Sequence, residues 1–378
     1  MIQQAVDGHT KITDVQSRWL RVPLPQPIAD STHVLRAIDL ILVYVQAGEQ
    51  SGVSYMLSFD YAPALLKGLI DWELKKLLIG RNSAEIRKIY QDCLHSIEYV
   101  GQEGLARWGL SAVETALWDL LGKRLQSPVC LLLGLNATKV PAYGSGGWVS
   151  YTDEELADEV GRYIARGFRG VKIKIGGASE VRDVERVRAV RRIIGPDKKL
   201  MADANQGLTL SGALRLVRRL EDCCLDWLEE PFPREDIESY CRLANATEIP
   251  LAAGEREYGI DGFRRLAEKR AVAVVQPDLM RAGGVTGWRL VAALSEAYRL
   301  KLSPHFYKEY DVHLAACVPN LIAIEVFDWL DPLLKHPLEI QDGYAIAPER
   351  PGFGVDFREE AIKEFEVKGQ PASVAVAG

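Results

Sequence analysis

The first third of the chain alternates between apolar and polar positions with two different periods. Alternation with period two is typical of β-strands that bury one face, and it occurs at residues 12–22, 38–45 and 53–56. Helical periodicity, with apolar residues three or four positions apart, follows at about residues 62–78, 83–96 and 105–124. Strands followed by helices predict an α+β layout for this part.

The pattern of apolar and polar positions changes at Val140. From there, short apolar runs alternate with amphipathic stretches such as residues 152–166, 180–194 and 210–220. This alternation indicates parallel βαβ units. Eight strands are predicted, and they end near Tyr143, Ile175, Ala202, Leu228, Gly254, Pro277, Pro304 and Val326. Eight strands favour a closed barrel of the TIM type, with an open doubly wound sheet as the alternative.

The segment after the eighth strand has no regular helical pattern. It passes through Pro332 and Pro337 into residues 343–357, where glycine and proline recur. Such a composition is typical of turns and irregular chain. We expect this tail to pack back on the first domain.

Charge and hydropathy narrow the class of partner. Lys and Arg total 46 against 52 Asp and Glu, so nothing in the balance favours binding to nucleic acid. No uninterrupted apolar run reaches membrane-spanning length, and residues 1–14 are polar where a signal peptide would be apolar. These features predict a soluble cytoplasmic protein that binds neither nucleic acid nor membrane.

The cysteines show no CxxC pairing that would indicate a metal or redox motif. Most of them lie in apolar stretches, and free cysteine packs as a small hydrophobic residue. We expect six reduced residues in the core: Cys93, Cys130, Cys223, Cys224, Cys241 and Cys317.

Chemically versatile side chains recur at the predicted strand ends. They are Lys174, Asp203, Glu229, Glu255, Asp278, His305 and Glu325, with separations of 29, 26, 26, 23, 27 and 20 residues. A βα unit of a barrel takes about thirty residues. The spacing therefore predicts that these side chains meet at the carboxyl-end mouth, where barrel enzymes place their active sites.

Three of these residues are carboxylates on consecutive strands. Asp203, Glu229 and Glu255 would converge as hard oxygen ligands and leave other coordination positions for water or substrate. Any one of them alone could be a surface carboxylate or a helix N-cap. The matched positions of all three favour a Mg²⁺ site.

Lys172 and Lys174 lie two positions apart, so they share one face of a strand. In a barrel strand this face is the interior, because the apolar residues between them suit the helix-packed exterior. Buried ammonium groups need a function or a partner. Two lysines on an exposed edge are the alternative.

His305 ends the seventh predicted strand and Asp278 ends the sixth. The imidazole could donate one ring N–H to the carboxylate while its other nitrogen faces the pocket. This pairing predicts an acid–base dyad. The other histidines lack such a partner; His313 is expected in packing, and surface or loop positions are expected for His9, His33, His95 and His336.

At these positions the chain resembles the mandelate-racemase-like members of the enolase superfamily, which use a Lys or His base with Mg²⁺. The resemblance covers nearly the whole chain. It is carried by Lys172-Ile173-Lys174, Asp203-Ala204-Asn205-Gln206, Trp227-Leu228-Glu229-Glu230-Pro231, Gly254-Glu255, Gln276-Pro277-Asp278, Pro304-His305, Ala116-Leu117-Trp118-Asp119 and Pro351-Gly352-Phe353-Gly354.

The resemblance implies an α/β fold in which an N-terminal α+β capping domain, completed by the C-terminal tail, covers a (β/α)₇β barrel. The implied divisions are residues 1–135, 136–335 and 336–378. It also implies one Mg²⁺ per active site on Asp203, Glu229 and Glu255, with Glu229 used rather than Glu230. A homo-oligomer built from dimers, up to an octamer, is typical of such proteins.

By the same resemblance Lys174 is the base on one face of the substrate. Lys172 lies beside it, touches the substrate carboxylate and lowers the pKa of Lys174. His305, oriented by Asp278, is the acid or base on the other face, and Glu325 in its protonated form bonds the second carboxylate oxygen. Further substrate contacts are expected at Asn205, Ser145 and His33.

Within the family, Asp278 is followed by Leu279-Met280-Arg281 rather than by a catalytic lysine, which points to the mandelate-racemase type. Residues 304–306, 312–316 and 327–333 resemble talarate/galactarate dehydratases, whereas residues 31–34 and 306–309 differ from them. The leading hypothesis is a hydro-lyase that forms a 2-keto-3-deoxy acid from a sugar acid through an enediolate. A racemase or epimerase and a non-catalytic sugar-acid sensor are the alternatives.

Overall fold

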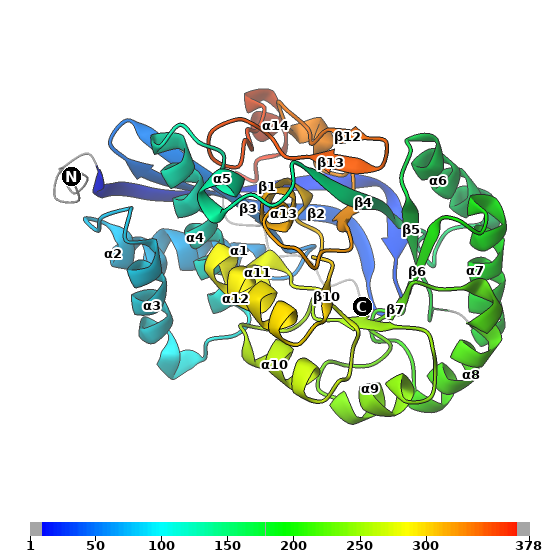
Figure 1. The fold of residues 1–378 in the computed structure, drawn as a ribbon. Coiled ribbons are helices and arrows are strands. Elements are labelled where there is room, and N and C mark those ends of the chain that lie inside the picture. The colour runs from blue at the N-terminus through cyan, green and yellow to red at the C-terminus, as the bar shows by residue number, and fades with distance from the viewer. Residues whose placement is uncertain (1–9, 178, 369–378) are drawn as a thin grey trace, which may run out of the picture.

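The computed structural model describes residues 10–177 and 179–368. His9 and most of the polar N-terminal segment lie outside the described residues. The chain forms a sheet-and-helix layer, blue and cyan in Figure 1, against a ring of strands and helices coloured from green to yellow. The fold class expected from the sequence is confirmed.

The first layer begins with an antiparallel meander of β1 (Ile12–Ala29), β2 (Val34–Ala47) and β3 (Gln50–Leu57). Its strands are longer than the sequence pattern predicts, because β1 continues past a register shift between Pro23 and Ile28. The turn at Gly48 has a positive φ of 61°, which glycine adopts without strain. The extended end of β1 and the start of β2 carry the chain to the mouth of the barrel.

The helices that follow pack on this sheet or on one another. They are α1 (Pro63–Gly68), the π-helical η3 (Leu69–Leu74), α2 (Lys75–Leu78), α3 (Ile86–Ser96), the 3₁₀ turn η4 (Glu98–Val100), α4 (Leu105–Arg124) and α5 (Val129–Leu133). The bounds of α4 match the prediction, since its long apolar stripe packs on β2 and β3. The stretch predicted as one helix at 62–78 is divided by the π-helical segment.

Eight parallel strands form the barrel: β4 (Lys139–Gly146), β5 (Gly170–Lys174), β6 (Lys199–Asp203), β7 (Trp227–Glu229), β8 (Leu251–Ala253), β9 (Val274–Val275), β10 (Lys301–Leu302) and β11 (Ile324–Val326). Strand β11 pairs with β4, and a parallel bridge from Leu302 to Leu321 joins β10 to the segment before β11. The sheet therefore closes, as the eight-strand reading predicted.

Seven helical connections surround the ring (Figure 1): α6 (Asp153–Ala165), α7 (Glu180–Ile194), α8 (Leu210–Leu220) with η5 (Glu221–Cys223), α9 (Ile237–Ala244), α10 (Asp261–Glu268), α11 (Leu279–Ala282) with α12 (Gly284–Ala297), and α13 (Lys308–Ala315). Inside the ring, Tyr143, Met201, Trp227, Ala252, Val274 and Ala323 form one buried layer. This layer closes the lower barrel and leaves the next layer, toward the carboxyl ends, for polar side chains.

The tail consists of η6 (Asp331–Leu333), β12 (Ile340–Gln341), β13 (Tyr344–Ile346) and α14 (Glu359–Phe365). Strand β13 pairs antiparallel with the start of β4. Helix α14 packs on β1, and Arg18 makes a two-pronged ion pair with Glu366 just after this helix. The tail therefore lies across both parts of the chain, as Figure 1 shows in orange and red.

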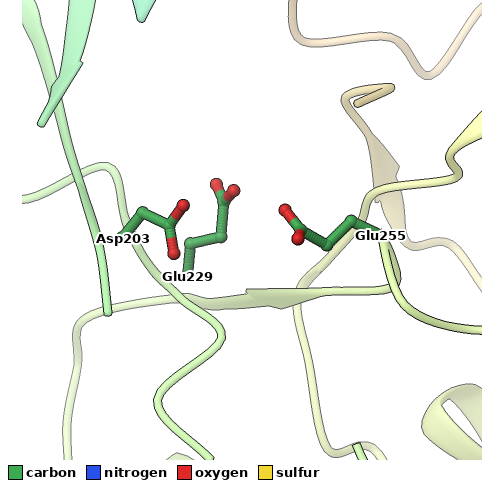
Figure 2. A group of neighbouring side chains, drawn as sticks. All are labelled: Asp203, Glu229 and Glu255. Atoms are coloured by element: carbon green, nitrogen blue, oxygen red, sulfur yellow. The ribbon is translucent and has the colours of Figure 1, made fainter. Parts of the chain in front are cut away.

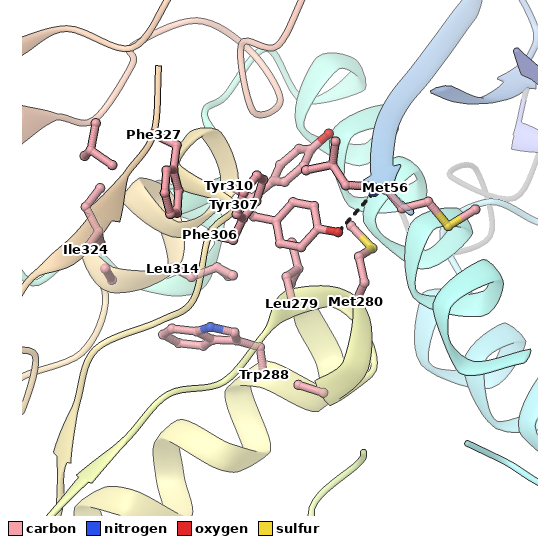
Figure 3. Packing of buried hydrophobic residues seen from close by; sticks show 14 of the residues in the cluster. Met56, Leu279, Met280, Trp288, Phe306, Tyr307, Tyr310, Leu314, Ile324 and Phe327 are labelled. Atoms are coloured by element: carbon pink, nitrogen blue, oxygen red, sulfur yellow. Dashed lines mark hydrogen bonds between the residues drawn. The ribbon is translucent and has the colours of Figure 1, made fainter. Parts of the chain in front are cut away.

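Aromatic residues at the start of α13 join the first layer to the barrel (Figure 3). The Tyr310 hydroxyl accepts a hydrogen bond from Tyr55 N–H at 2.9 Å, and the Tyr307 hydroxyl accepts one from Leu57 N–H at 3.3 Å. Burial of these rings contributes the larger share of the contact energy. The two hydroxyls fix where β3 ends over the barrel mouth.

The remaining sequence expectations concern cysteines, histidines and membrane spans. All six cysteines are free; Cys93, Cys130 and Cys223 are buried, but Cys224 is exposed, so the expectation of six core residues is wrong for it. His95 and His336 are exposed and His313 is buried. None of the helices in the described part of the chain has the length and apolar character that crossing a membrane requires.

Candidate active site

The strand ends bring the predicted polar residues together in one layer of the barrel. Lys174 is in register with Asp203, and Asp203 is in register with Glu229. Because alternate side chains face the interior, residues two positions beyond the buried apolar layer point into the mouth. The strand pleat and the closed ring are therefore what position the site.

Asp203, Glu229 and Glu255 point toward a common space (Figure 2). They offer one oxygen each within 4.8 Å of one another, and all three side chains are buried. Burial and the neighbouring Asp203 raise the pKa of Glu229 to about 7, against the lowering effect of Lys172. Carboxylates this close repel one another, so the cluster needs a cation to be stable in its ionised form.

The donor set fits a hard divalent cation. Three carboxylate groups supply oxygen ligands, which Mg²⁺ prefers, and leave positions for water and substrate. Glu255 Oε2 has no hydrogen-bond partner among the described residues, although His305 Nε2 lies 3.4 Å away. The three residues could therefore bind a metal ion.

Both lysines of β5 form ion pairs with these carboxylates. Lys174 Nζ lies 2.5 Å from Asp203 Oδ2, and Lys172 contacts Glu229 and lies 2.7 Å from Glu325 Oε1. Burial lowers the pKa of Lys174 and Lys172 lowers it further, but Asp203 reverses this and the net shift is upward. Lys172 therefore lowers the pKa of Lys174, as expected, but in this arrangement the adjacent Asp203 carboxylate outweighs that effect.

His305 Nδ1 lies 2.8 Å from Asp278 Oδ2. A parallel bridge between the two backbones sets this contact, and Asp278 Oδ1 also caps α11 by accepting from the N–H groups of Met280 and Arg281. Burial opposes protonation of His305, but Glu255 and Asp278 raise its pKa to about 9. The structure thus brings the two residues of the expected dyad together.

Glu325 lies at the end of β11, where it accepts a hydrogen bond from Phe306 N–H at 3.1 Å. Burial favours its neutral form, yet Lys172, His305 and Lys174 together lower its pKa. The three cationic groups around the carboxylate favour its ionised form in this arrangement, and the protonated Glu325 that the resemblance implies stays a prediction.

Glu230 is buried beside Glu229 but turns away from the cluster. It has a positive φ of 36°, and it accepts hydrogen bonds from Arg256 at 3.0 Å and Gln206 at 3.3 Å. Its ion pair with Arg256 explains why only the first of the two adjacent glutamates joins the metal-binding cluster.

A cavity of about 150 Å³ lies above the cluster, between the barrel mouth and the first layer. Lys174, His305, Glu255, Asn205 and His33 line it. The Asn205 Oδ1 atom has no hydrogen-bond partner among the described residues. Ser145 is placed differently: it is buried in the barrel on β4, in register with Lys172, and is not among the residues that line the cavity.

His33 has a partner that was not predicted from the sequence. Its Nδ1 lies 3.2 Å from Asp30 Oδ1, and both residues line the cavity. The three-residue spacing from Asp30, at a turn where side chains of Asp bond nearby backbone N–H groups, was the available signal. His33 is thus a half-buried residue of the candidate site rather than an isolated surface histidine.

One wall of the cavity is aromatic and was not predicted from the sequence. It is formed by Phe59, Trp148, Phe306, Phe327 and Trp329. These rings contact one another with centroids between 4.7 and 6.2 Å apart. Four of them follow the end of a barrel strand by one to four residues: Trp148 after β4, Phe306 after β10, and Phe327 and Trp329 after β11. A barrel places its binding loops at such positions. That position was the signal that could have identified them.

Known families match both parts of the chain. The mandelate racemase/muconate lactonizing enzyme N-terminal domain matches residues 12–134, and the enolase C-terminal domain-like family matches residues 155–361. Relatives with named activities match the chain, and two of them are described here. A 3,6-anhydro-α-L-galactonate cycloisomerase from Streptomyces coelicolor is 33% identical over 96% of this chain and 99% of its own. An L-talarate/galactarate dehydratase from Salmonella typhimurium is 34% identical over 76% of this chain and 73% of its own.

A solved structure of L-talarate dehydratase from Polaromonas sp. JS666, complexed with Mg and L-glucarate, superimposes with a TM-score of 0.88. It is 31% identical, and the match covers 95% of this chain and 98% of that one. Dehydratases of this kind are hydro-lyases. The family resemblance drawn from the sequence motifs is confirmed: the chain belongs to the mandelate racemase/muconate lactonizing enzyme family of the enolase superfamily.

Proposed function

We propose that this protein is a Mg²⁺-dependent enzyme that removes the proton beside the carboxylate of a sugar acid and then eliminates the oxygen substituent on the next carbon. The observation that carries the proposal is the arrangement of two proton-transfer groups around one cavity. Lys174, at the end of β5, and His305, just after β10, both line it, and the strands between them include the carboxylate-bearing strands β6 to β8.

We propose that Asp203, Glu229 and Glu255 hold a Mg²⁺ ion, and the solved L-talarate dehydratase, which is complexed with Mg, supports this choice of ion. Bound there, the ion would supply Lewis-acid stabilisation of the negative charge that grows on the substrate carboxylate. Lys172 and Lys174, which neutralise the three carboxylates in this structure, would then be free to face the substrate. Lys172 stabilises charge on the carboxylate, and Lys174 in its neutral form accepts the α-proton.

His305 completes the reaction from the other side. Its imidazolium, favoured by Glu255 and Asp278, gives a proton to the oxygen on the β-carbon as the carbon–oxygen bond breaks. When that oxygen is a hydroxyl, water leaves and the resulting enol becomes a 2-keto-3-deoxy acid. Asp278 orients the ring, and Asn205 contacts the substrate.

A cycloisomerase is the second candidate, and the relative matched over 99% of its own length favours it. The same two proton transfers would apply to a sugar acid whose β-oxygen is part of an ether ring. Breaking that bond opens the ring without losing water, so substrate and product are isomers. A racemase or epimerase would return the proton to the α-carbon and break no carbon–oxygen bond.

The experiment is incubation of the Mg²⁺-loaded protein with sugar acids in D₂O, followed by proton NMR and a colorimetric test for 2-keto acids. Loss of the α-proton signal together with a keto acid supports elimination. Exchange with inverted configuration and no keto acid would indicate an epimerase. Absence of exchange with every acid, in a protein that binds Mg²⁺, would refute the proposal.

The domain divisions at residues 135 and 335, the dimer-based assembly and the cytoplasmic location stay predictions. Substrate contacts were also predicted for His33 and Ser145, and the position of only one of them supports a direct contact. His33 lines the cavity, whereas Ser145 is beneath it and would act through Lys172.

A further inference from the structure

Two hydrogen-bond donors of the first layer line the cavity without a partner. Ser58 follows β3 and is 1% exposed, and Trp108 lies in α4. Neither Ser58 Oγ nor Trp108 Nε1 has a hydrogen-bond partner among the described residues. Burying such a group unpaired is unfavourable, so a ligand or an ordered water must satisfy both. A hydroxyl and an indole N–H are uncharged, and they suit the oxygens of a neutral group.

Two arginines line the cavity, and each is paired with a carboxylate: Arg256 Nε lies 3.0 Å from Glu230 Oε2, and Arg281 Nη1 lies 3.5 Å from Asp278 Oδ2. Lys172 and Lys174 are assigned to the first carboxylate and to the α-proton. The Arg281 guanidinium also stacks over the Trp108 ring at 5.1 Å. A substrate with two carboxylates would therefore find no unpaired cation for the second one among the described lining residues.

Asp30 adds negative charge at the rim of the cavity. Its Oδ1 accepts hydrogen bonds from Thr32 N–H and His33 N–H, each at 2.7 Å. Bonds of this kind favour the ionised form of a carboxylate. A carboxylate at the far end of the substrate would approach this like charge, which is unfavourable in a buried setting.

The size and the walls of the cavity point to a small, partly apolar molecule. About 150 Å³ is the share of about five water molecules in the liquid, so the space favours a small ligand. The aromatic wall, with Phe327 and Trp329 stacked at 4.7 Å, offers a flat apolar surface to the carbon–hydrogen face of a sugar.

We infer that the substrate is a small sugar acid with one carboxylate and a neutral far end, whose oxygens accept hydrogen bonds from Ser58 Oγ and Trp108 Nε1. The inference rests on the proposed function and narrows it to aldonates and anhydro-aldonates rather than aldarates. Ser58 and Trp108 thereby determine specificity, and Asp30 excludes the second carboxylate.

Matched pairs of acids test this directly. Galactonate and galactarate differ only at C6, a primary alcohol in the first and a carboxylate in the second, and gluconate and glucarate form a second such pair. For whichever pair is turned over, kcat/KM for the aldonate is expected to exceed that for the aldarate by about 100-fold or more. Equal or faster turnover of the aldarate would overturn the inference.

Variants test the assigned residues. Ser58→Ala and Trp108→Phe are each expected to raise KM for the aldonate by about 3- to 10-fold with a smaller change in kcat. Ser211→Ala and Trp72→Phe change the same residue types at exposed positions and serve as controls. Asp30→Asn is expected to lower the ratio of kcat/KM for the aldonate to kcat/KM for the aldarate. Unchanged KM in both Ser58→Ala and Trp108→Phe would refute the assignment of the two donors.

Binding separates this inference from the proposed function. Calorimetric titration of Mg²⁺-loaded Lys174→Ala with the four acids measures affinity without turnover. Tighter binding of the aldonates by this variant, in combination with no α-proton exchange by the Mg²⁺-loaded wild type, would support the inference and refute the function. Tighter binding of the aldarates would refute the inference, even if α-proton exchange is observed.

Discussion

His305 and Asp278 occupy neighbouring strand ends, with Nδ1 and Oδ2 2.8 Å apart, while Asp278 Oδ1 caps α11. One carboxylate therefore has two separable tasks. Its first oxygen supports the fold by accepting from backbone N–H groups, and its second oxygen orients the imidazole. A substitution that keeps the first oxygen and changes the second can separate catalysis from stability.

Asp278→Asn is that substitution. The amide oxygen can still cap α11, but the amide nitrogen cannot accept the N–H of His305. We expect kcat to fall by about 10²- to 10⁴-fold, the range typical of general acid–base groups, with a small change in thermal midpoint. Asp261→Asn, at the exposed start of α10, is the matched control. A loss of stability in parallel with activity would contradict the separation.

Metal removal is expected to abolish turnover and lower stability. Asp203, Glu229 and Glu255 repel one another when ionised, so an ion that binds only the folded state adds stability. Saturation at 100 times its dissociation constant adds about 2.7 kcal/mol. Melting curves with EDTA and with Mg²⁺ measure this. Asp203→Asn should lose most of the Mg²⁺-dependent shift, and an equal shift in that variant would argue against the predicted ligand set.

His313 gives the fold a pH dependence of its own. Its Nε2–H donates to the Phe353 carbonyl at 3.1 Å, and its Nδ1 accepts from Cys130 N–H at 3.4 Å. Burial lowers the pKa of His313 from 6.5 to about 4. Below pH 6.5, His313 is therefore protonated in the unfolded chain but stays neutral in the folded protein. The free energy of unfolding falls as the pH falls toward 4.

When the pH is lowered from 7 to 5, protonation of His313 in the unfolded chain should reduce the free energy of unfolding by about 2 kcal/mol. Urea titrations at the two pH values measure the loss in the wild type and in His313→Gln, which lacks the titrating ring. The variant should show a loss smaller by about that amount. His95→Gln, at an exposed position, should behave as the wild type does. Identical losses in His313→Gln and the wild type would show that His313 is not responsible.

Asp119 joins three segments of the fold. It accepts hydrogen bonds from Phe353 N–H and Val53 N–H, each at 2.8 Å, and forms an ion pair with Lys123. Asp119→Ala leaves two backbone donors unpaired in the interior, so we expect a loss of about 2–4 kcal/mol in unfolding free energy. Asp92→Ala, which removes two solvent-exposed ion pairs with Arg81 and Lys88, should cost less than about 1 kcal/mol. Equal losses would contradict the role assigned to Asp119.

The barrel and the polar residues at its mouth could be predicted because both follow from local pattern. Apolar runs recur at the length of a βα unit, so Lys174 and His305 could be placed in one layer before any contact was known. The helix at residues 105–124 was predictable for the same reason. Its apolar stripe extends over five turns.

Contacts between distant segments could not be predicted in this way. Ser58 and Trp108 reach the cavity only because β3 and α4 dock on the barrel mouth, and neither residue belongs to a periodic pattern. The raised pKa of Lys174 required knowing which carboxylate lies beside it. The register of β5 with β6 decides that. The Glu230 side chain turns away from the carboxylate cluster because the residue has a positive φ and pairs with Arg256, and no local pattern predicts either feature.

The most direct test of the proposed mechanism compares Lys174→Ala with His305→Asn for α-proton exchange and keto acid formation in D₂O with Mg²⁺. Lys174→Ala is expected to lose both. His305→Asn is expected to keep exchanging the α-proton while keto acid formation falls by about 100-fold or more. Exchange that persists in Lys174→Ala, or product that forms at the wild-type rate in His305→Asn, would contradict the division of roles proposed for these two residues.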